Sequence, residues 1–194
     1  MTIERLGIFG GTFDPPHVGH LVVAVNVRYA LRLDRVLLVV ANDPWQKSGG
    51  RAVSPAGDRL AMVRAAVGDV DGLEASAVEL DRGGTSYTAD TLATLRAEDP
   101  DRELVLILGS DAASGLPTWE RADEVRSLAS IAVVVRPGAE EGRPPPGWDW
   151  QRVETPRLEV SSTDLRARFV DGRPLDYLLT PAVIACIEAR GLYR

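Results

Sequence analysis

Residues 6–20 read LGIFGGTFDPPHVGH, and this stretch decides the fold because it joins an apolar run to a glycine-bearing turn. Residues 6–9 have the character of a buried strand, and a helical pattern begins at Val18. Both histidines of the chain, His17 and His20, lie at this junction. A helix N-terminus offers unpaired N–H groups and partial positive charge. The junction therefore predicts an anion site, and we expect the anion to be a phosphate.

The alternation of strand and helix continues along most of the chain. Near-continuous apolar runs, which are typical of strands covered on both faces, occur at residues 5–9, 35–41, 73–80, 103–108 and 131–135. Helical patterns lie between them at residues 18–31, 55–67, 88–97 and 118–129. This order predicts an α/β fold with a doubly wound, mainly parallel, Rossmann-like sheet.

The C-terminal part is expected to be small and helical. A short strand is predicted near residues 157–160, followed by a helix that opens at Ser162 or Thr163. The last helix has Thr180 as its cap and Gly191 as its stop.

The chain is expected to form a single domain over residues 1–194. Its core is predicted over residues 1–136, and residues 151–194 form the C-terminal phosphate-binding turn and helices. Residues 137–150 between them contain three consecutive prolines and show no periodicity, which indicates a loop.

Composition excludes several classes of protein. The chain has 194 residues, 45% hydrophobic and 26% charged, as in an ordinary globular protein. A formal net charge of −6 argues against a general nucleic-acid binder. A single cysteine, Cys186, excludes an intramolecular disulfide and a cysteine-based metal site. Neither a signal peptide nor a membrane-spanning stretch is visible, so we expect a cytoplasmic protein without a membrane partner.

The residue types of the opening turn suit a phosphate. Gly10 and Gly11 allow close approach to backbone N–H groups, and Thr12 adds a hydroxyl donor. His17 and His20 are three positions apart, so on a helix they share one face and can donate to the same oxygen atoms. One alternative is a pair of helix-start histidines, one of them capping. A zinc site is another, although it would have only Asp14 as a nearby third ligand.

The sequence of residues 10–20, GGTFDPPHVGH, resembles the signature of the nucleotidyltransferase superfamily, and its longer form is similar to the bacterial nicotinate mononucleotide adenylyltransferases. The resemblance extends over almost the whole chain, through residues 42–47, 85–92, 109–111, 117–119, 136–138, 161–166 and 191–194. The later segments narrow the resemblance from the superfamily to the pyridine mononucleotide enzymes.

The resemblance implies that the protein transfers the adenylyl group of ATP to nicotinate mononucleotide. The products are nicotinate adenine dinucleotide and pyrophosphate, in NAD biosynthesis, with Mg²⁺ accompanying ATP and no protein ligands to the metal. A different phosphorylated acceptor, such as pantetheine phosphate, is one alternative. A nucleotide-binding module without turnover is another. The choice between acid and amide substrate and the oligomeric state, including a homo-oligomer, stay open.

The resemblance also assigns roles to single residues. The catalytic residues it implies are His17, His20, Lys47 and Arg166. The ATP-binding residues are Gly10, Gly11, Thr12, Phe13, His17, His20, Gly109, Asp111, Arg136, Ser162, Thr163 and Arg166. The residues that bind the acceptor are Asn42, Lys47, Thr85, Tyr87, Asp111 and Trp119.

Several of these residues have a physical interpretation of their own. Lys47 is the only lysine among 22 basic residues and follows a predicted strand; the alternative is a solvated loop cation. Thr85 and Tyr87 precede a predicted helix whose N-terminus suits a carboxylate, whereas plain capping by Thr88 would also explain them. The indole of Trp119 offers a flat surface for a pyridine ring, or a core side chain.

Two further groups lie at predicted strand or helix ends. Asp111 follows a strand at the carboxyl edge of the sheet, where an aspartate can accept ribose hydroxyl groups or cap the next helix. Ser162 and Thr163 open a helix that carries Arg166 in its first turns. A cation near a helix N-terminus opposes the dipole, so this arrangement favours a bound anion. Arg168 is interpreted as a surface or secondary contact.

Overall fold

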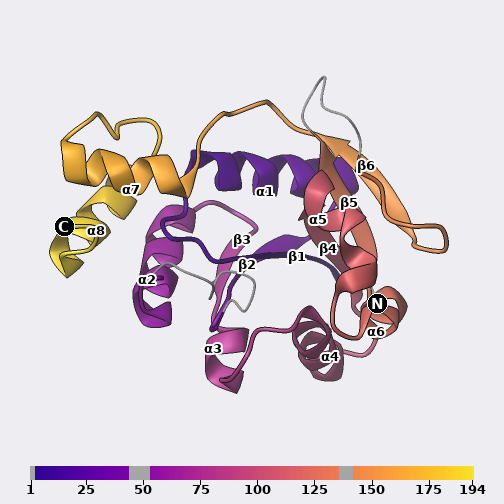
Figure 1. The fold of residues 1–194 in the computed structure, drawn as a ribbon. Helices are drawn as coiled ribbons and strands as arrows, with labels where there is room; N and C mark the ends of the chain where they lie inside the picture. Colours follow the sequence, from indigo (N-terminus) through magenta and orange to yellow (C-terminus); the bar gives the residue numbers. More distant parts are fainter. Residues whose placement is uncertain (1–2, 44–52, 136–141) are drawn as a thin grey trace.

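The protein forms one parallel β-sheet with helices against both faces (Figure 1). The computed structural model describes residues 3–43, 53–135 and 142–194. The strands are β1 Arg5–Gly11, β2 Arg35–Val40, β3 Leu73–Ser76, β4 Glu103–Gly109, β5 Ser130–Val135 and β6 Trp150–Glu154. Their order is β3-β2-β1-β4-β5-β6, and every neighbouring pair is parallel. The predicted doubly wound sheet is confirmed.

The helices connect the strands and cover them. They are α1 Val18–Leu31, α2 Ala56–Val67, α3 Val78–Arg82, α4 Thr88–Glu98, α5 Ser110–Ser114, α6 Ala122–Leu128, α7 Ser162–Asp171 and α8 Pro181–Arg190, with a 3-10 turn η2 at Leu116–Thr118. Figure 1 shows α1 on one side of the sheet and α3 and α4 on the other. The strand order reverses between β1 and β4, where ligands of doubly wound sheets bind at the carboxyl ends.

Burial on both faces explains the near-continuous apolar strands. In β4, Leu104, Leu106 and Leu108 belong to the core beneath α4, α5 and α6. Val105 and Ile107 alternate with them and belong to the core beneath α1 and α2. Each such buried side chain contributes about 1.5–3 kcal/mol of transfer free energy. The central strands are therefore rigid, and they fix the positions of the loops at their ends.

Two strand predictions differ from the structure near the edges of the sheet: the strand predicted at residues 73–80 is shorter, and the strand predicted near residues 157–160 is absent. Only the first half of residues 73–80 is β3, which pairs with four residues of β2; α3 then begins at Val78. Val78 is apolar because it packs against the core from this helix. No strand forms at residues 157–160; the sixth strand is β6, in which only Val153 is buried. A strand with one buried side chain gives little apolar signal.

The core of the sheet therefore continues past the boundary expected at residue 136. The predicted C-terminal part begins inside β6, which pairs with β5, and the described part of the predicted loop, 142–149, has no helix or strand. The helix predicted over residues 118–129 is shorter than expected. It begins at Ala122, because Arg121 has a left-handed backbone with φ 55°.

The two C-terminal helices dock on α2 through a separate apolar cluster. Its buried members are Met62, Ala66, Leu165, Leu179, Val183 and Ile187. The Ser161 hydroxyl accepts from the backbone N–H of Asp164 and so caps α7. The predicted cap of α8 by Thr180 and its stop at Gly191, with φ 62°, are confirmed. Cys186 packs, partly buried, against the same cluster.

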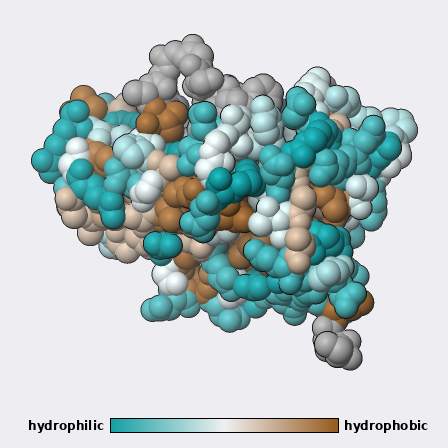
Figure 2. Space-filling view, turned by 90° about the horizontal axis from the view of Figure 1, so that it is seen from below, coloured by the Kyte–Doolittle hydropathy of each residue, from teal (hydrophilic) through white to brown (hydrophobic). Residues whose placement is uncertain are grey.

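The surface is largely polar. Figure 2 shows the face seen from below Figure 1, where hydrophilic residues predominate and hydrophobic residues form small groups near the middle. Across the described residues, no helix combines the length and apolar character needed to cross a bilayer.

Candidate active site

The turn after β1 is built differently from the expectation. Gly10 and Gly11 belong to the strand itself, and the left-handed residue of the turn is Phe13, with φ 50°. A Cβ on Gly11 would lie 2.9 Å from the Phe13 ring, so the glycine makes room for this phenylalanine. Phe13 is buried against α1, followed by a cis peptide bond between Asp14 and Pro15. The turn therefore presents the start of α1 to the end of β1.

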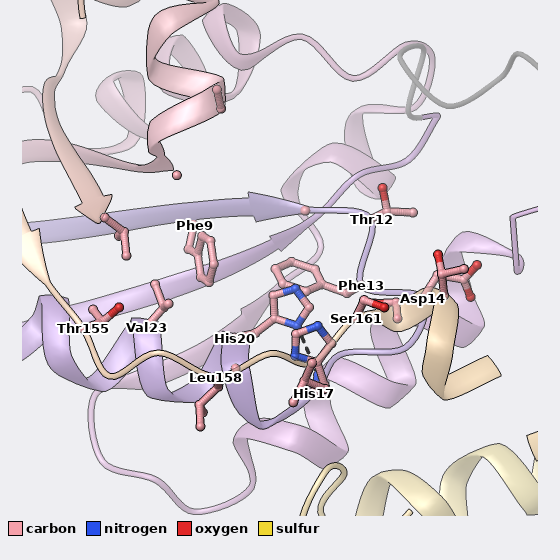
Figure 3. A pocket seen from close by; sticks show the side chains of 18 of the residues that line it. Phe9, Thr12, Phe13, Asp14, His17, His20, Val23, Thr155, Leu158 and Ser161 are labelled. Carbon is pink, nitrogen blue, oxygen red and sulfur yellow. Dashed lines mark hydrogen bonds between the residues drawn. The ribbon is translucent and has the colours of Figure 1, made fainter. Parts of the chain in front are cut away.

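The two histidines form a stacked pair at the start of α1. Their ring centroids are 3.8 Å apart with an interplanar angle of 26°, and the Phe13 ring lies edge-on to His20 at 5.0 Å (Figure 3). The backbone N–H of His17 donates to Nδ1 of His20 at 3.1 Å. A neutral ring that accepts at Nδ1 carries its hydrogen on Nε2. His20 therefore caps the helix through one nitrogen and keeps a donor on the other.

Gly19 fixes the position of the first ring. A Cβ at this position would lie 3.0 Å from Nδ1 and 3.1 Å from Cε1 of His17. A side chain there would press on the His17 ring, so the glycine allows the ring its present position.

A cavity of about 750 Å³ opens over this pair. Its lining includes most of the residues predicted to bind ATP, namely Gly11, Thr12, Phe13, His17, His20, Gly109, Asp111, Ser162, Thr163 and Arg166. Figure 3 shows His17 and His20 from α1 near Ser161, with Thr155 and Leu158 on the segment that passes beside Val23. Asp111 is exposed at the start of α5 and makes no side-chain capping bond, so the capping alternative for it was wrong. The structure brings together residues that are more than 140 positions apart.

The start of α7 is tied directly to the histidine turn. The Ser162 hydroxyl donates to the Pro15 carbonyl at 2.8 Å, and the Arg166 guanidinium donates to the Asp14 carbonyl and to Oγ1 of Thr163. The turn and the helix N-terminus thus form adjoining walls of one cavity. Arg168 points elsewhere, to Asp164 at 2.6 Å, which agrees with its expected secondary role.

Asp14 is a buried carboxylate at the base of this turn. Its exposed fraction is 3%, and it accepts from the Tyr193 hydroxyl at 2.6 Å and from the Ser54 backbone N–H at 3.4 Å. Burial alone would raise the pKa of Asp14, but these hydrogen bonds and the positive charge of Arg166 outweigh it, so the pKa lies below its ordinary value. The carboxylate is therefore ionised and anchors the turn.

A second cavity of about 180 Å³ adjoins the first and shares Gly11 and Thr12 with it. It is lined by Tyr87 and Thr88 at the start of α4 and by Trp119. The N-cap residue of α4 is Tyr87 and makes no side-chain capping bond, so the interpretation of Thr88 as the cap was wrong. Trp119 is half-buried: it packs against the core and also lines the cavity, and its stacking on a pyridine ring stays a prediction.

Asn42 and Thr85 lie on two loops that are hydrogen-bonded to each other beside the second cavity. The backbone N–H of Asn42 donates to the Ser86 hydroxyl at 2.8 Å, and its side-chain amide donates to the Gly84 carbonyl at 2.8 Å. Thr85 pairs with Asp43 in an isolated bridge and does not line the cavity. The loops after β2 and before α4 are therefore joined. Of Thr85 and Tyr87, Tyr87 is the one that lines the cavity.

Two predicted site residues, Lys47 and Arg136, lie outside the described residues, so their roles stay predictions. In the described ranges, no group of three or more histidine, cysteine, aspartate or glutamate side chains could hold a metal ion. His17, His20 and Asp14, the residues of the zinc alternative, do not form such a group.

Comparison with known proteins identifies the family. A family model described as cytidylyltransferase-like matches residues 8–168. The chain is 46% identical to the probable nicotinate-nucleotide adenylyltransferase of Roseiflexus sp. (strain RS-1), with 100% of both chains covered. The chain belongs to the nicotinate-nucleotide adenylyltransferases of this family. It is also 45% identical to the probable enzyme of that name from Streptomyces coelicolor, covering 95% of this chain and 98% of the relative.

Solved structures support the nicotinate-nucleotide adenylyltransferase fold. The nicotinic acid mononucleotide adenylyltransferase of Plasmodium falciparum, complexed with NaAD, has a TM-score of 0.76 at 16% identity, covering 98% of this chain and 97% of its own. A putative nicotinate-nucleotide adenylyltransferase from Vibrio parahaemolyticus has a TM-score of 0.70 at 21% identity, covering 99% and 96%. At these identities the likeness concerns the fold alone.

Sequence reasoning missed three residues that support the site in this family member. Asp14 was weighed only as a metal ligand, and Tyr193 was noted only within a terminal motif. Arg59 was not noticed at all, although it occupies a buried position of α2 four residues before Val63. A charged residue within the apolar stripe of a helix was the available signal.

Proposed function

We propose that this protein transfers the adenylyl group of ATP to nicotinate mononucleotide, forming nicotinate adenine dinucleotide and pyrophosphate in NAD biosynthesis. One observation carries the proposal: two cavities meet at Gly11 and Thr12, at the end of β1. The larger one is lined by the histidine pair and the start of α7, and the smaller one by an indole and a helix N-terminus. The relatives of 40–46% identity carry the name of this activity.

The larger cavity suits the triphosphate. His20 points its Nε2–H toward charge that develops on the α-phosphoryl oxygens, and His17 lies stacked beside it. Arg166, the Thr163 hydroxyl and the N-terminus of α7 at Ser162 are proposed to hold the β- and γ-phosphates, because the Ser162 hydroxyl itself already donates to the Pro15 carbonyl. Their own hydrogen bonds to the histidine turn set the distance between the two groups.

The chemical step is an in-line displacement. An oxygen of the acceptor 5′-phosphate forms a bond to the α-phosphorus of ATP, and the bond from that phosphorus to the bridging oxygen of the β-phosphate breaks. The electron pair leaves with pyrophosphate. Because the attacking phosphate is already an anion, no general base is needed, and catalysis consists of positioning and charge stabilisation. Lys47 and Arg136 are proposed to neutralise further phosphate charge.

Mg²⁺ is proposed to enter with ATP. The described carboxylates along the larger cavity are Asp14, which is already hydrogen-bonded to Tyr193 and Ser54, and the exposed Asp111. This donor set fits a metal held mainly by phosphate oxygens and waters, as is usual for Mg²⁺. When bound, the ion neutralises triphosphate charge as pyrophosphate departs.

The smaller cavity suits the pyridine ring of the acceptor. The ring stacks on Trp119, and its carboxylate lies at the N-terminus of α4, near Tyr87 and Thr88. Glu79 and Glu120 also line this cavity, and a carboxylate there would favour the N–H groups of an amide. Nicotinamide mononucleotide is therefore the second candidate acceptor.

The deciding experiment measures pyrophosphate release from ATP with nicotinate mononucleotide, nicotinamide mononucleotide or pantetheine phosphate. We expect kcat/KM to be highest with the nicotinate compound. No release with any acceptor, despite ATP binding, would instead identify a nucleotide-binding module. Trp119→Ala tests the acceptor side: it should raise the KM for the mononucleotide far more than the KM for ATP. Equal effects on both would remove the stacking role.

A further inference from the structure

Arg59 is a fully buried arginine beneath the candidate site. Its exposed fraction is 1%, and it lies in the first turn of α2. Its guanidinium donates to three backbone carbonyls: Nε to Ser54 at 2.8 Å, Nη1 to Thr12 at 2.9 Å and Nη2 to Asn42 at 3.2 Å. These carbonyls belong to three separate segments, which follow β1, follow β2 and precede α2.

The chemistry of this contact requires arginine. Burial lowers the pKa of Arg59, while the negative charges of Asp14 and Glu79 act in the opposite direction. An arginine stays protonated in a protein, and its planar fork donates from three separate nitrogens, whereas the three donors of a lysine ammonium all lie on one nitrogen. A well-packed apolar residue would often stabilise such a core at least as well as a buried cation. The presence of Arg59 is therefore explained by the three backbone carbonyls that it binds, and not by the stability of the core alone.

Each of the three segments leads to a different part of the site. Thr12 lines both cavities. Asn42 holds the Ser86 hydroxyl, which lines the smaller cavity. The backbone N–H of Ser54 donates to Asp14, whose carbonyl in turn accepts from Arg166 in the larger cavity. One guanidinium thus fixes the ATP side and the acceptor side relative to each other.

We propose that Arg59 is a positioning residue for adenylyl transfer. It sets the separation between the turn after β1 and the loop after β2, and thereby aligns the acceptor phosphate with the α-phosphorus. This inference rests on the proposed function. A misplacement of about 1 Å can cost about 10²-fold in rate, so loss of Arg59 should reduce kcat more than it weakens the binding of either substrate.

The test compares Arg59→Met and Arg59→Lys with Arg64→Met, an exposed arginine five residues later on the same helix. We expect Arg59→Met to lower kcat about 10²-fold while the Kd of ATP and of the mononucleotide, each measured alone by calorimetry, change less than about threefold. Arg59→Lys should recover only a small part of the rate. In Arg59→Ala, added ethylguanidinium should restore kcat by about tenfold or more, because it refills the vacated fork.

Amide hydrogen exchange gives a readout that does not depend on the acceptor. Exchange at residues 12–14 and 42–43 should accelerate in Arg59→Met, with helix α4 unchanged. If the wild type releases no pyrophosphate, the proposed function fails, and the exchange data still decide whether Arg59 orders these segments. The positioning role is overturned if folded Arg59→Met keeps the kcat of Arg64→Met. It is also overturned if the variants fail to fold and ethylguanidinium restores nothing, since Arg59 then serves stability alone.

Discussion

His20 performs two tasks with two nitrogens of one ring. Nδ1 accepts the backbone N–H of His17, so it belongs to the cap of α1. A neutral ring that accepts at Nδ1 carries its hydrogen on Nε2, and this N–H is the proposed donor to a phosphoryl oxygen. The choice between a capping and a catalytic histidine, which the sequence left open, is therefore not exclusive for His20.

Replacing His20 separates these tasks. His20→Ala should lower kcat by about 10²-fold or more, because a donor to developing charge is lost. His20→Asn should lose a similar amount of rate but retain more of the thermal stability, since its side-chain oxygen can still accept from His17. Steady-state kinetics and thermal melts measure the two effects. Near-normal turnover by either variant would contradict the role of Nε2.

Gly19→Ala tests whether the stacked geometry of the rings matters. The new methyl group would press on the His17 ring at about 3 Å. We expect kcat to fall roughly three- to tenfold, as a displacement of less than 1 Å would cause. Stability should not fall, because alanine is favoured over glycine in a helix by about 1 kcal/mol.

Gly57→Ala is the matched control for this substitution. Gly57 is the second residue of α2, as Gly19 is of α1, and a Cβ there meets nothing within 4 Å. It should leave kcat unchanged. Equal kinetics for the two variants would show that the position of the His17 ring is not important for the rate.

Helix α7 depends on its docking to bring Arg166 to the site. Its buried residue Leu165 packs with α2 and α8, and the next residue, Arg166, lines the larger cavity. The helices and the histidine turn are then linked by the hydrogen bonds of Ser162 and Arg166. Apolar packing and a polar contact on the same helix thus act together on the larger cavity.

Leu165→Ala should loosen this docking. Truncating a fully buried leucine costs about 2–5 kcal/mol, and we expect the KM for ATP to rise several-fold while the KM for the mononucleotide changes little. Val170→Ala is the control, because Val170 lies on the same helix with an exposed fraction of 75%; it should change neither stability nor the KM for ATP by much. Urea denaturation and ATP titrations measure both. An unchanged KM for ATP in a destabilised Leu165→Ala would uncouple docking from binding.

A hydrogen bond from Tyr193, the next-to-last residue, to Asp14 joins the C-terminal segment to the turn after β1. The pKa of Asp14 is lowered, so its contribution to stability is present above its ordinary value of 3.8 and is lost as the pH falls below it. Burial, followed by the hydrogen bond to Asp14, raises the pKa of the Tyr193 phenol. Its contribution is therefore complete below pH 10.0, the ordinary value, and is lost as the pH rises above it.

Tyr193→Phe should lower the free energy of unfolding and reduce its dependence on pH on both the acid and the alkaline side. The free energy of unfolding at pH 7 should fall by about 1–3 kcal/mol, because the buried Asp14 loses a partner. Urea denaturation near pH 3, 7 and 10.5 measures it, with Tyr29→Phe, 87% exposed, as the control. A Tyr193→Phe profile parallel to that of the control would show that this hydrogen bond does not link folding to pH.

Local patterns in the chain were enough to predict the parallel, doubly wound class of sheet, the last helix with its Thr180 cap and the segment that carries both histidines. The apolar strands are buried on both faces, so their signal is strong, and the caps of α7 and α8 are short-range contacts. The edge strands β3 and β6 were misplaced because pairing with a neighbour, and not apolar content, sets their length. Gly10 and Gly11 were misread as the turn because the strand continues to Gly11 and Phe13 takes the left-handed backbone.

The sequence alone identified the family and predicted a phosphate site at the histidine turn, since residues 6–20 carry strand, turn, helix start and both histidines within one local segment. Long-range contacts supplied the rest. The joining of Arg166 to Asp14, of Tyr193 to the same residue, and of Arg59 to three loops spans many positions along the chain. No periodicity records such contacts, because each depends on where the helices come to rest against the completed sheet.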